Sequence, residues 1–200
     1  MDIMSQSVNQ ELIEFLDNSP TCFQAVENFR KMLKDAGYSE LLECEKWEIV
    51  PGGKYFVTRN DSSIIAFSVP KKDFTGFQLI CSHTDSPSFK IKENAEMDAD
   101  GKYTKLNVEG YGGMLCAPWF DRPLSVAGRI AVRTENGIET RLVNLDQDLA
   151  MIPNLAIHMN REANSGYKYN IQKDMLPIVG EASSKGKLMK LVAENAGVKE

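Results

Sequence analysis

The sequence predicts an α/β protein, and three observations support that fold class. Apolar residues recur at helical spacing up to residue 37, and from Trp47 the period changes to two. An apolar run over residues 76–82 then has the composition of a buried strand. Helices followed by a strand meander and a buried strand are typical of the opening of an α/β layer.

Two helices are expected at the N-terminus. Over residues 8–18 apolar side chains recur at every third or fourth position, and the pattern ends near Asn18. Ser19-Pro20-Thr21 is a typical helix start, and apolar residues continue at helical spacing until Gly37, which closes the second helix.

Four strands are expected next, each bounded by turn residues. Their ranges are 46–50, 54–59, 63–69 and 76–82. The intervening segments Pro51-Gly52-Gly53, Asn60-Asp61 and 70–73 carry the residues that favour turns.

After Pro87 the sequence predicts a second, β-rich unit. Alternating segments begin at Phe89 and at Tyr103, and residues 126–133 and 138–145 flank an Asn-Gly pair that favours a hairpin. Residues 183–197 return to a helical pattern. The second unit is therefore expected to follow the strand at 76–82 as an insertion.

Composition narrows the function classes. The chain has 200 residues, is 42% hydrophobic and 26% charged, and carries a net charge of −5. This charge and the lack of a basic motif argue against nucleic-acid binding. The four cysteines form no Cys-x-x-Cys pair, and neither a signal peptide nor an apolar stretch of membrane-spanning length is visible. A cytoplasmic location is expected.

His83-Thr84-Asp85 is the strongest chemical signal, and His83 is one of only two histidines. At the end of a strand, alternation would turn both side chains to one side, so that His83 could bind a metal while Asp85 orients a ligand. The structural alternative is a strand-end histidine followed by a turn residue. For His158, the second histidine, the alternative is a partly buried strand position.

Three further motifs have simpler structural interpretations. Residues 96–101 resemble a calcium loop but lack its ligand series, so a hairpin turn is expected. Tyr111-Gly112-Gly113 lacks the strand and helix of a phosphate loop, which favours a bend. Trp119-Phe120-Asp121-Arg122 fits either a docking patch or a buried anchor. The sequence contains no Gly-x-Ser-x-Gly elbow, so covalent catalysis has little support.

Four blocks, in order and spacing, resemble the aspartyl aminopeptidase family of dinuclear zinc metallopeptidases. They are Cys81-Ser82-His83-Thr84-Asp85-Ser86-Pro87, residues 111–122, Ala127-Gly128-Arg129, and Ile152-Pro153-Asn154-Leu155-Ala156-Ile157-His158. The likeness extends from the first helix to the last residue and identifies the chain as the N-terminal portion of such a protein.

The resemblance implies a zinc-peptidase-like α/β catalytic domain that begins at residues 1–88. It also implies an inserted β-rich dimerisation domain, of which residues 89–200 are an incomplete copy. His83 matches a metal ligand, Asp85 the acid that orients a metal ligand, and His158 a histidine presented to the neighbouring subunit's active site. The cofactors implied are two bridged divalent metals, usually zinc, and the assembly implied is a homo-oligomer of dimers that form a dodecamer.

The function implied is that of a cytoplasmic metalloaminopeptidase, which removes N-terminal residues from peptides through a metal-activated water. Acidic N-terminal residues are candidates for removal, but Pro123 stands where many relatives carry an acid. The family's other metal ligands lie beyond residue 200, so the piece alone is expected to bind metal weakly and to lack useful activity. One alternative is a non-catalytic oligomerisation module, and another is a small-molecule binding protein. No nucleic-acid or membrane partner is expected.

Overall fold

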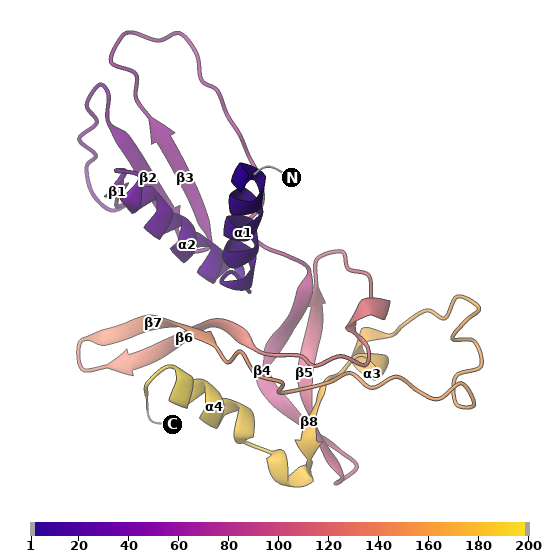
Figure 1. Cartoon of the computed structure of the whole chain (residues 1–200). Coiled ribbons are helices and arrows are strands. Elements are labelled where there is room, and N and C mark those ends of the chain that lie inside the picture. The colour runs from indigo at the N-terminus through magenta and orange to yellow at the C-terminus, as the bar shows by residue number, and fades with distance from the viewer. Residues whose placement is uncertain (1–2, 199–200) are drawn as a thin grey trace. The chain divides into compact units, whose positions relative to one another are not determined.

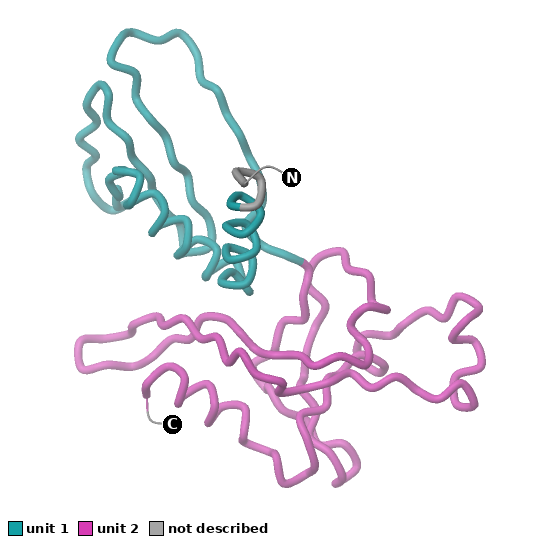
Figure 2. The backbone as a smooth tube through the Cα atoms, viewed as in Figure 1, with its two compact units in different colours: residues 1–86 teal, residues 87–200 magenta. Residues whose placement is uncertain are grey.

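The computed structural model describes residues 3–198, which fall into two compact units (Figure 1 and Figure 2). Unit 1 is Met1–Ser86 and unit 2 is Pro87–Glu200, and each is described by itself. The division lies two residues before the boundary expected between residues 88 and 89. None of the helices in residues 3–198 has the length and apolar character needed to cross a membrane.

Unit 1 begins with the two expected helices, α1 (Ile3–Asp17) and α2 (Cys22–Asp35). Thr21 caps α2, since its side-chain oxygen accepts a hydrogen bond from the backbone N–H of Phe23. Gly37 has φ +78° and ends the helix in a left-handed conformation, as expected for glycine. Both helices confirm the predicted pattern, although α1 starts before the predicted residue 8.

A three-stranded sheet follows, in the order β1-β2-β3. Its strands are β1 (Ser39–Leu41), β2 (Lys54–Arg59) and β3 (Ser63–Ser68). Strands β2 and β3 pair antiparallel around Asn60 and Asp61, both at positive φ, which confirms the predicted strands at 54–59 and 63–69. Strand β1, which pairs parallel with β2, was not predicted.

Two of the predicted strands are wrong. Residues 46–50 are irregular and exposed, and the indole of Trp47 donates a hydrogen bond to the carbonyl of Leu42 at 2.8 Å. Residues 76–82 are neither strand nor buried, because no strand among residues 3–198 pairs with them, and Ile80 is fully exposed. An extended segment without a paired neighbour has no hydrogen-bond ladder to define it as a strand.

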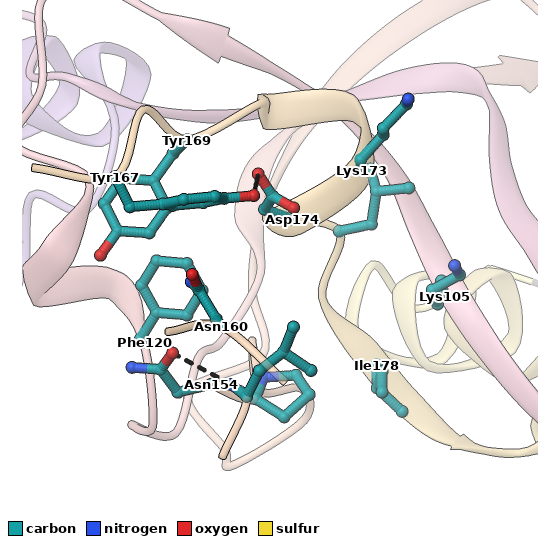
Figure 3. Close-up of a pocket in the computed structure, with 12 residues that line it drawn as sticks. Lys105, Phe120, Asn154, Asn160, Tyr167, Tyr169, Lys173, Asp174 and Ile178 are labelled. Atoms are coloured by element: carbon teal, nitrogen blue, oxygen red, sulfur yellow. Dashed lines mark hydrogen bonds between the residues drawn. The ribbon is translucent and has the colours of Figure 1, made fainter. Parts of the chain in front are cut away.

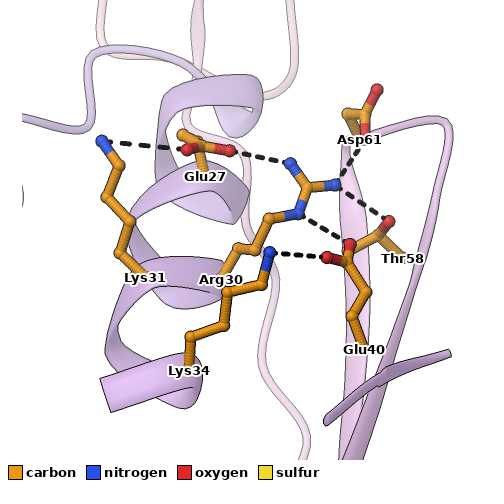
Figure 4. A network of polar contacts seen from close by, with 7 residues as sticks. All are labelled: Glu27, Arg30, Lys31, Lys34, Glu40, Thr58 and Asp61. Atoms are coloured by element: carbon orange, nitrogen blue, oxygen red, sulfur yellow. Dashed lines mark hydrogen bonds and ion pairs between the residues drawn. The ribbon is translucent and has the colours of Figure 1, made fainter. Parts of the chain in front are cut away.

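Arg30 on α2 is the centre of a polar network that joins the helix to the sheet (Figure 4). Its guanidinium donates to Glu27 at 2.7 Å, Asp61 at 2.8 Å, Glu40 at 2.9 Å and Thr58 at 3.2 Å. Burial alone would lower the pKa of Arg30, but the hydrogen bonds to Asp61 and Glu27 outweigh it and raise the pKa above its ordinary value. Arg30 therefore stays charged and ties α2 to β1 and to the β2–β3 turn.

Unit 2 contains two sheets. The first has the order β4-β5-β8, with β4 (Ser88–Ala99), β5 (Tyr103–Tyr111) and β8 (Ile178–Glu181). The second is the predicted hairpin of β6 (Ala127–Thr134) and β7 (Gly137–Asn144). Asp100 and Gly101 form the β4–β5 turn with positive φ, which confirms a hairpin turn at the segment that resembles a calcium loop.

The helices of unit 2 are short. They are a 3-10 turn at Ala117–Trp119, α3 (Ile171–Asp174), a second 3-10 turn at Ala182–Ser184, and α4 (Lys187–Asn195). The last two occupy the predicted helical stretch 183–197, with the α-helix confined to its centre. At residues 111–113, Gly112 has φ +74° and lies close to Pro87, which confirms the expected bend.

The core of unit 2 lies between β5, β7 and α4. Its buried side chains include Leu106, Val108, Val143, Leu188 and Val192. Glu96 holds α4 in place, because its carboxylate accepts hydrogen bonds from the backbone N–H groups of Gly186 and of Leu188 (3.1 Å) at the start of the helix. A register shift in β4 between Ile91 and Glu96 interrupts the pairing immediately before this contact.

Candidate metal centre

His83, Thr84 and Asp85 lie in an irregular segment of unit 1 that follows β3. The expectation that His83 ends a buried strand is wrong, since the His83 side chain is 79% exposed. The segment is nevertheless fixed to the sheet, because the hydroxyl of Thr84 donates a hydrogen bond of 2.7 Å to the carbonyl of Ser62 in the β2–β3 turn. The turn therefore positions the residues on both sides of Thr84.

The structure brings His83 and Asp85 together. His83 Nδ1 lies 2.7 Å from the backbone carbonyl oxygen of Asp85 and 3.4 Å from its Oδ1. A carbonyl oxygen can only accept, so Nδ1 carries the proton in this contact. In the neutral ring this places the lone pair on Nε2, which is the arrangement that metal-binding histidines adopt when a carbonyl or carboxylate holds their other nitrogen.

These residues fit one ligand of a metal and the group that orients it. A catalytic zinc site normally has three protein ligands, and residues 3–198 contain no cluster of three or more His, Cys, Asp or Glu side chains that could hold a metal. Within that part of the chain, His83 Nδ1 contacts Asp85, and Nε2 of the same ring could serve as one metal ligand. Further ligands would have to come from elsewhere.

His158 lies in unit 2, on a turn at residues 157–159, and is exposed. The alternative of a partly buried strand histidine is therefore wrong. The carbonyl of Ala156 accepts hydrogen bonds from the backbone N–H groups of Met159 (2.8 Å) and Asn160 (3.2 Å), which shapes this turn. His83 belongs to unit 1 and His158 to unit 2, so each is described within its own unit.

Unit 2 also contains a cavity of about 200 Å³ that the sequence did not indicate (Figure 3). Its wall includes the aromatic rings of Phe120, Tyr167 and Tyr169. The ring centroids of Phe120 and Tyr169 are 5.0 Å apart, and those of the two tyrosines are 5.4 Å apart. The hydroxyl of Tyr167 donates to Asp174 at 3.1 Å, and this hydrogen bond raises the pKa of Tyr167. The alternating Tyr167-Lys168-Tyr169 pattern is the sequence feature that could have indicated this aromatic wall.

The rings of Trp119 and Phe120 are half-buried and packed against other rings. Trp119 contacts Phe89 edge to face at 5.0 Å, and Phe120 contacts Tyr169. The sequence left open whether this motif forms a docking patch or a buried anchor. Both aromatic side chains pack within unit 2, which favours the anchor. Their packing fixes the backbone at Asp121, which lies next to them in the chain.

Residues 15–200 match the family model described as aminopeptidase I zinc metalloprotease (M18). The chain is 48% identical over 199 residues to a probable M18 family aminopeptidase 2 of Clostridium acetobutylicum, and the match covers 94% of this chain and 45% of that relative. The chain thus spans about half the length of the curated relatives it matches.

Solved structures share the fold. The structure of the Ape4 and Nbr1 complex contains a chain with TM-score 0.90 and 37% identity, covering 97% of this chain and 40% of that one. The S. cerevisiae mApe1 dodecamer gives TM-score 0.76 and 26% identity, covering 96% of this chain and 45% of that one. An α/β fold with a β-rich second unit is therefore shared with aminopeptidases.

Proposed function

Because this chain belongs to the aminopeptidase I zinc metalloprotease (M18) family, we propose that it forms the N-terminal part of a metal-dependent aminopeptidase. Its family membership confirms the resemblance indicated by the four motifs. The proposed enzyme removes N-terminal residues from peptides. The observation that carries the proposal is the contact between His83 Nδ1 and Asp85, which leaves Nε2 open toward a metal.

His83 is proposed as one ligand of a centre of two bridged divalent metals, with zinc as the metal that the family description gives. Bound metal would lower the pKa of a water molecule and so supply the nucleophile for peptide hydrolysis. The role of Asp85 is to hold the imidazole of His83 in one orientation and one tautomer. The remaining ligands would lie outside residues 3–198.

Unit 2 is proposed as the inserted dimerisation domain, with boundaries near residue 88, and His158 as a group that it presents to the active site of a neighbouring subunit. The exposed turn of His158 supports this role, since an exposed imidazole can reach a partner. A positioned donor there could stabilise the oxyanion formed during attack on the peptide carbonyl. A homo-oligomer is proposed because the S. cerevisiae relative is a dodecamer.

A cytoplasmic location is also proposed. All four cysteines lie within residues 3–198, and none forms a disulfide in this part of the chain. Thiols remain reduced in the cytoplasm, where structural disulfides are rare. The cysteines therefore suit a reducing compartment.

The proposal is tested with zinc titration and peptidase assays on two proteins. The first is the 200-residue chain, and the second is a chimaera in which this chain replaces the matching part of the C. acetobutylicum relative. We expect weak zinc binding and no turnover for the chain alone, and turnover of aminoacyl substrates by the chimaera. Aspartyl, glutamyl and leucyl substrates, compared side by side, determine whether acidic residues are preferred.

Variants of the chimaera then test the roles of the two residues. H83A should abolish turnover and weaken metal binding. D85N keeps the backbone carbonyl that contacts His83 but loses the carboxylate, so it should reduce turnover while retaining a folded protein. Full activity of H83A would overturn the proposed metal role. Tight stoichiometric zinc with turnover by the chain alone would show that the site is complete within 200 residues.

An inactive chimaera that still forms oligomers through unit 2 would favour the alternative of an oligomerisation module. Analytical ultracentrifugation of the 200-residue chain measures that property without an activity assay.

A further inference from the structure

We propose that Asp121 is a positioning residue that fixes the backbone conformation of the loop carrying His158. This inference rests on the role proposed for His158, and it joins two segments that lie more than thirty residues apart in the sequence. The loop comprises residues 153–160, which follow the buried Ile152. Both segments belong to unit 2.

The backbone at Asp121 and the start of the loop are paired. Phe120 and Ile152 form a parallel bridge, and the N–H of Asp121 donates to the carbonyl of Ile152 at 3.0 Å. Ile152 is fully buried, so this end of the loop is anchored in the unit. The Phe120 ring adds a second anchor, because it packs against Tyr169.

The side chain of Asp121 extends this pairing into the loop. Its Oδ1 accepts a hydrogen bond from the backbone N–H of Asn154 at 2.8 Å, four residues before His158. Hydrogen bonds to an ionised acceptor are stronger than those between neutral groups. Asp121 also has φ +56°, a left-handed conformation that Asp and Asn adopt more readily than most residues. Asp, like Asn, therefore satisfies both requirements of this position, the acceptor oxygen and the tolerance of positive φ.

The effect of Asp121 passes along the loop through successive hydrogen bonds. Asn154 Oδ1 accepts from the N–H of Leu155 at 3.0 Å, and the carbonyl of Ala156 accepts from the amides that close the turn around His158. Pro153, Asn154, Leu155 and Asn160 also line the cavity described above (Figure 3). Packing behind the loop is therefore incomplete, and hydrogen bonds contribute a larger share of its order.

A matched pair of substitutions separates the hydrogen bond from the backbone conformation. D121N keeps an acceptor oxygen and a residue that tolerates positive φ, whereas D121G keeps the conformation but removes the acceptor. D100G is the control, because Asp100 has φ +54° in the distant β4–β5 turn. Amide hydrogen exchange of the 200-residue chain, measured by NMR, is the readout.

In D121G we expect the Asn154 amide to exchange at least about tenfold faster, since it loses a hydrogen bond of ordinary strength, while amides of β4 and β5 keep their rates. D121N should restore exchange to within about threefold of the unsubstituted chain, and D100G should leave the loop unchanged. Unchanged exchange at Asn154 in D121G would overturn the proposal. So would equal acceleration in D121N and D121G.

Activity of the chimaera separates this proposal from the role of His158. D121G should lower kcat about tenfold with KM unchanged, D121N should recover most of kcat, and adding D121G to H158Q should cause no further loss. A further loss in the double variant would contradict action through His158. If H158Q alone had full activity, the proposed role of His158 would fail, while the exchange data would still decide whether Asp121 orders the loop.

Discussion

Replacement of Arg30 by methionine tests whether one partly buried guanidinium holds unit 1 together. Methionine keeps an apolar stem of similar length but removes all five donors. The side chain of Arg30 is only 21% exposed, and it makes three ion pairs and one hydrogen bond to Thr58. Its loss removes the cation that three carboxylates share, although Lys31 still lies 3.8 Å from Glu27 and Lys34 2.8 Å from Glu40.

The expected cost is about 3.5 kcal/mol of the unfolding free energy of unit 1. Each ion pair of this partly buried group is taken at the upper end of the surface range, about 1 kcal/mol, and the hydrogen bond to Thr58 at about 0.5 kcal/mol. With a urea dependence of about 1–3 kcal/mol per molar for a small domain, the urea midpoint should fall by about 1 M or more.

The two tryptophans provide a specific assay, because Trp47 lies in unit 1 and Trp119 in unit 2. In a W119F background, the fluorescence of Trp47 reports urea unfolding of unit 1 alone. Arg59→Met is the matched control, since Arg59 pairs with Glu43 at 2.6 Å but is 78% exposed. The control should leave the midpoint unchanged. Equal shifts of the urea midpoint in Arg30→Met and Arg59→Met would refute the reasoning. The partly buried ion pairs of Arg30 would then contribute no more stability than the exposed ion pair of Arg59.

Three further outcomes are expected. Glu96→Ala removes the acceptors at the start of α4 and should destabilise unit 2 by about 1–2 kcal/mol, measured by Trp119 fluorescence in a W47F background; no shift would exclude a capping role. Gly137→Ala forces alanine to φ +125° and should cost unit 2 about 1 kcal/mol or more in the same urea assay, and a neutral result would contradict that conformation. Burial raises the pKa of Glu40, but hydrogen bonds and charges of neighbouring cations outweigh it and hold the pKa below its usual value. The Glu40 contribution is therefore present above the unfolded pKa of about 4.3 and is lost as pH falls through the lower folded pKa. The urea midpoint followed by Trp47 should drop across that window, and less steeply in the Arg30→Met variant.

Strands were predictable where both partners are close in the sequence. Residues 54–59 and 63–69 are joined by Asn60 and Asp61, so period and turn together identify a complete hairpin. Residues 46–50 and 76–82 have the same strand-like composition but no paired strand among residues 3–198. A strand depends on its neighbour for hydrogen bonds, which composition does not reveal.

For the candidate site, the sequence predicted that His83 and Asp85 would lie on one side of a strand. The two residues do lie close together, but outside any strand, and the contact of 2.7 Å involves the backbone carbonyl of Asp85. The exposed turn of His158 was not predictable, since Leu155-Ala156-Ile157 before it fits a strand equally well. The contact between Asp121 and Asn154 spans two motifs, and only a folded chain could reveal it.

The pairing of β5 with β8 sets the order in which the two units are expected to form. Tyr103 pairs with Glu181, so this sheet closes only after the whole hairpin of β6 and β7 and the His158 loop have been enclosed. Closure of a long loop carries an entropic cost, and distant pairings slow folding. In unit 1 the strand pairings join near neighbours, such as Ser39 with Tyr55. Unit 1 should therefore fold first, and the assembly of unit 2 should limit the rate at which the chain becomes native.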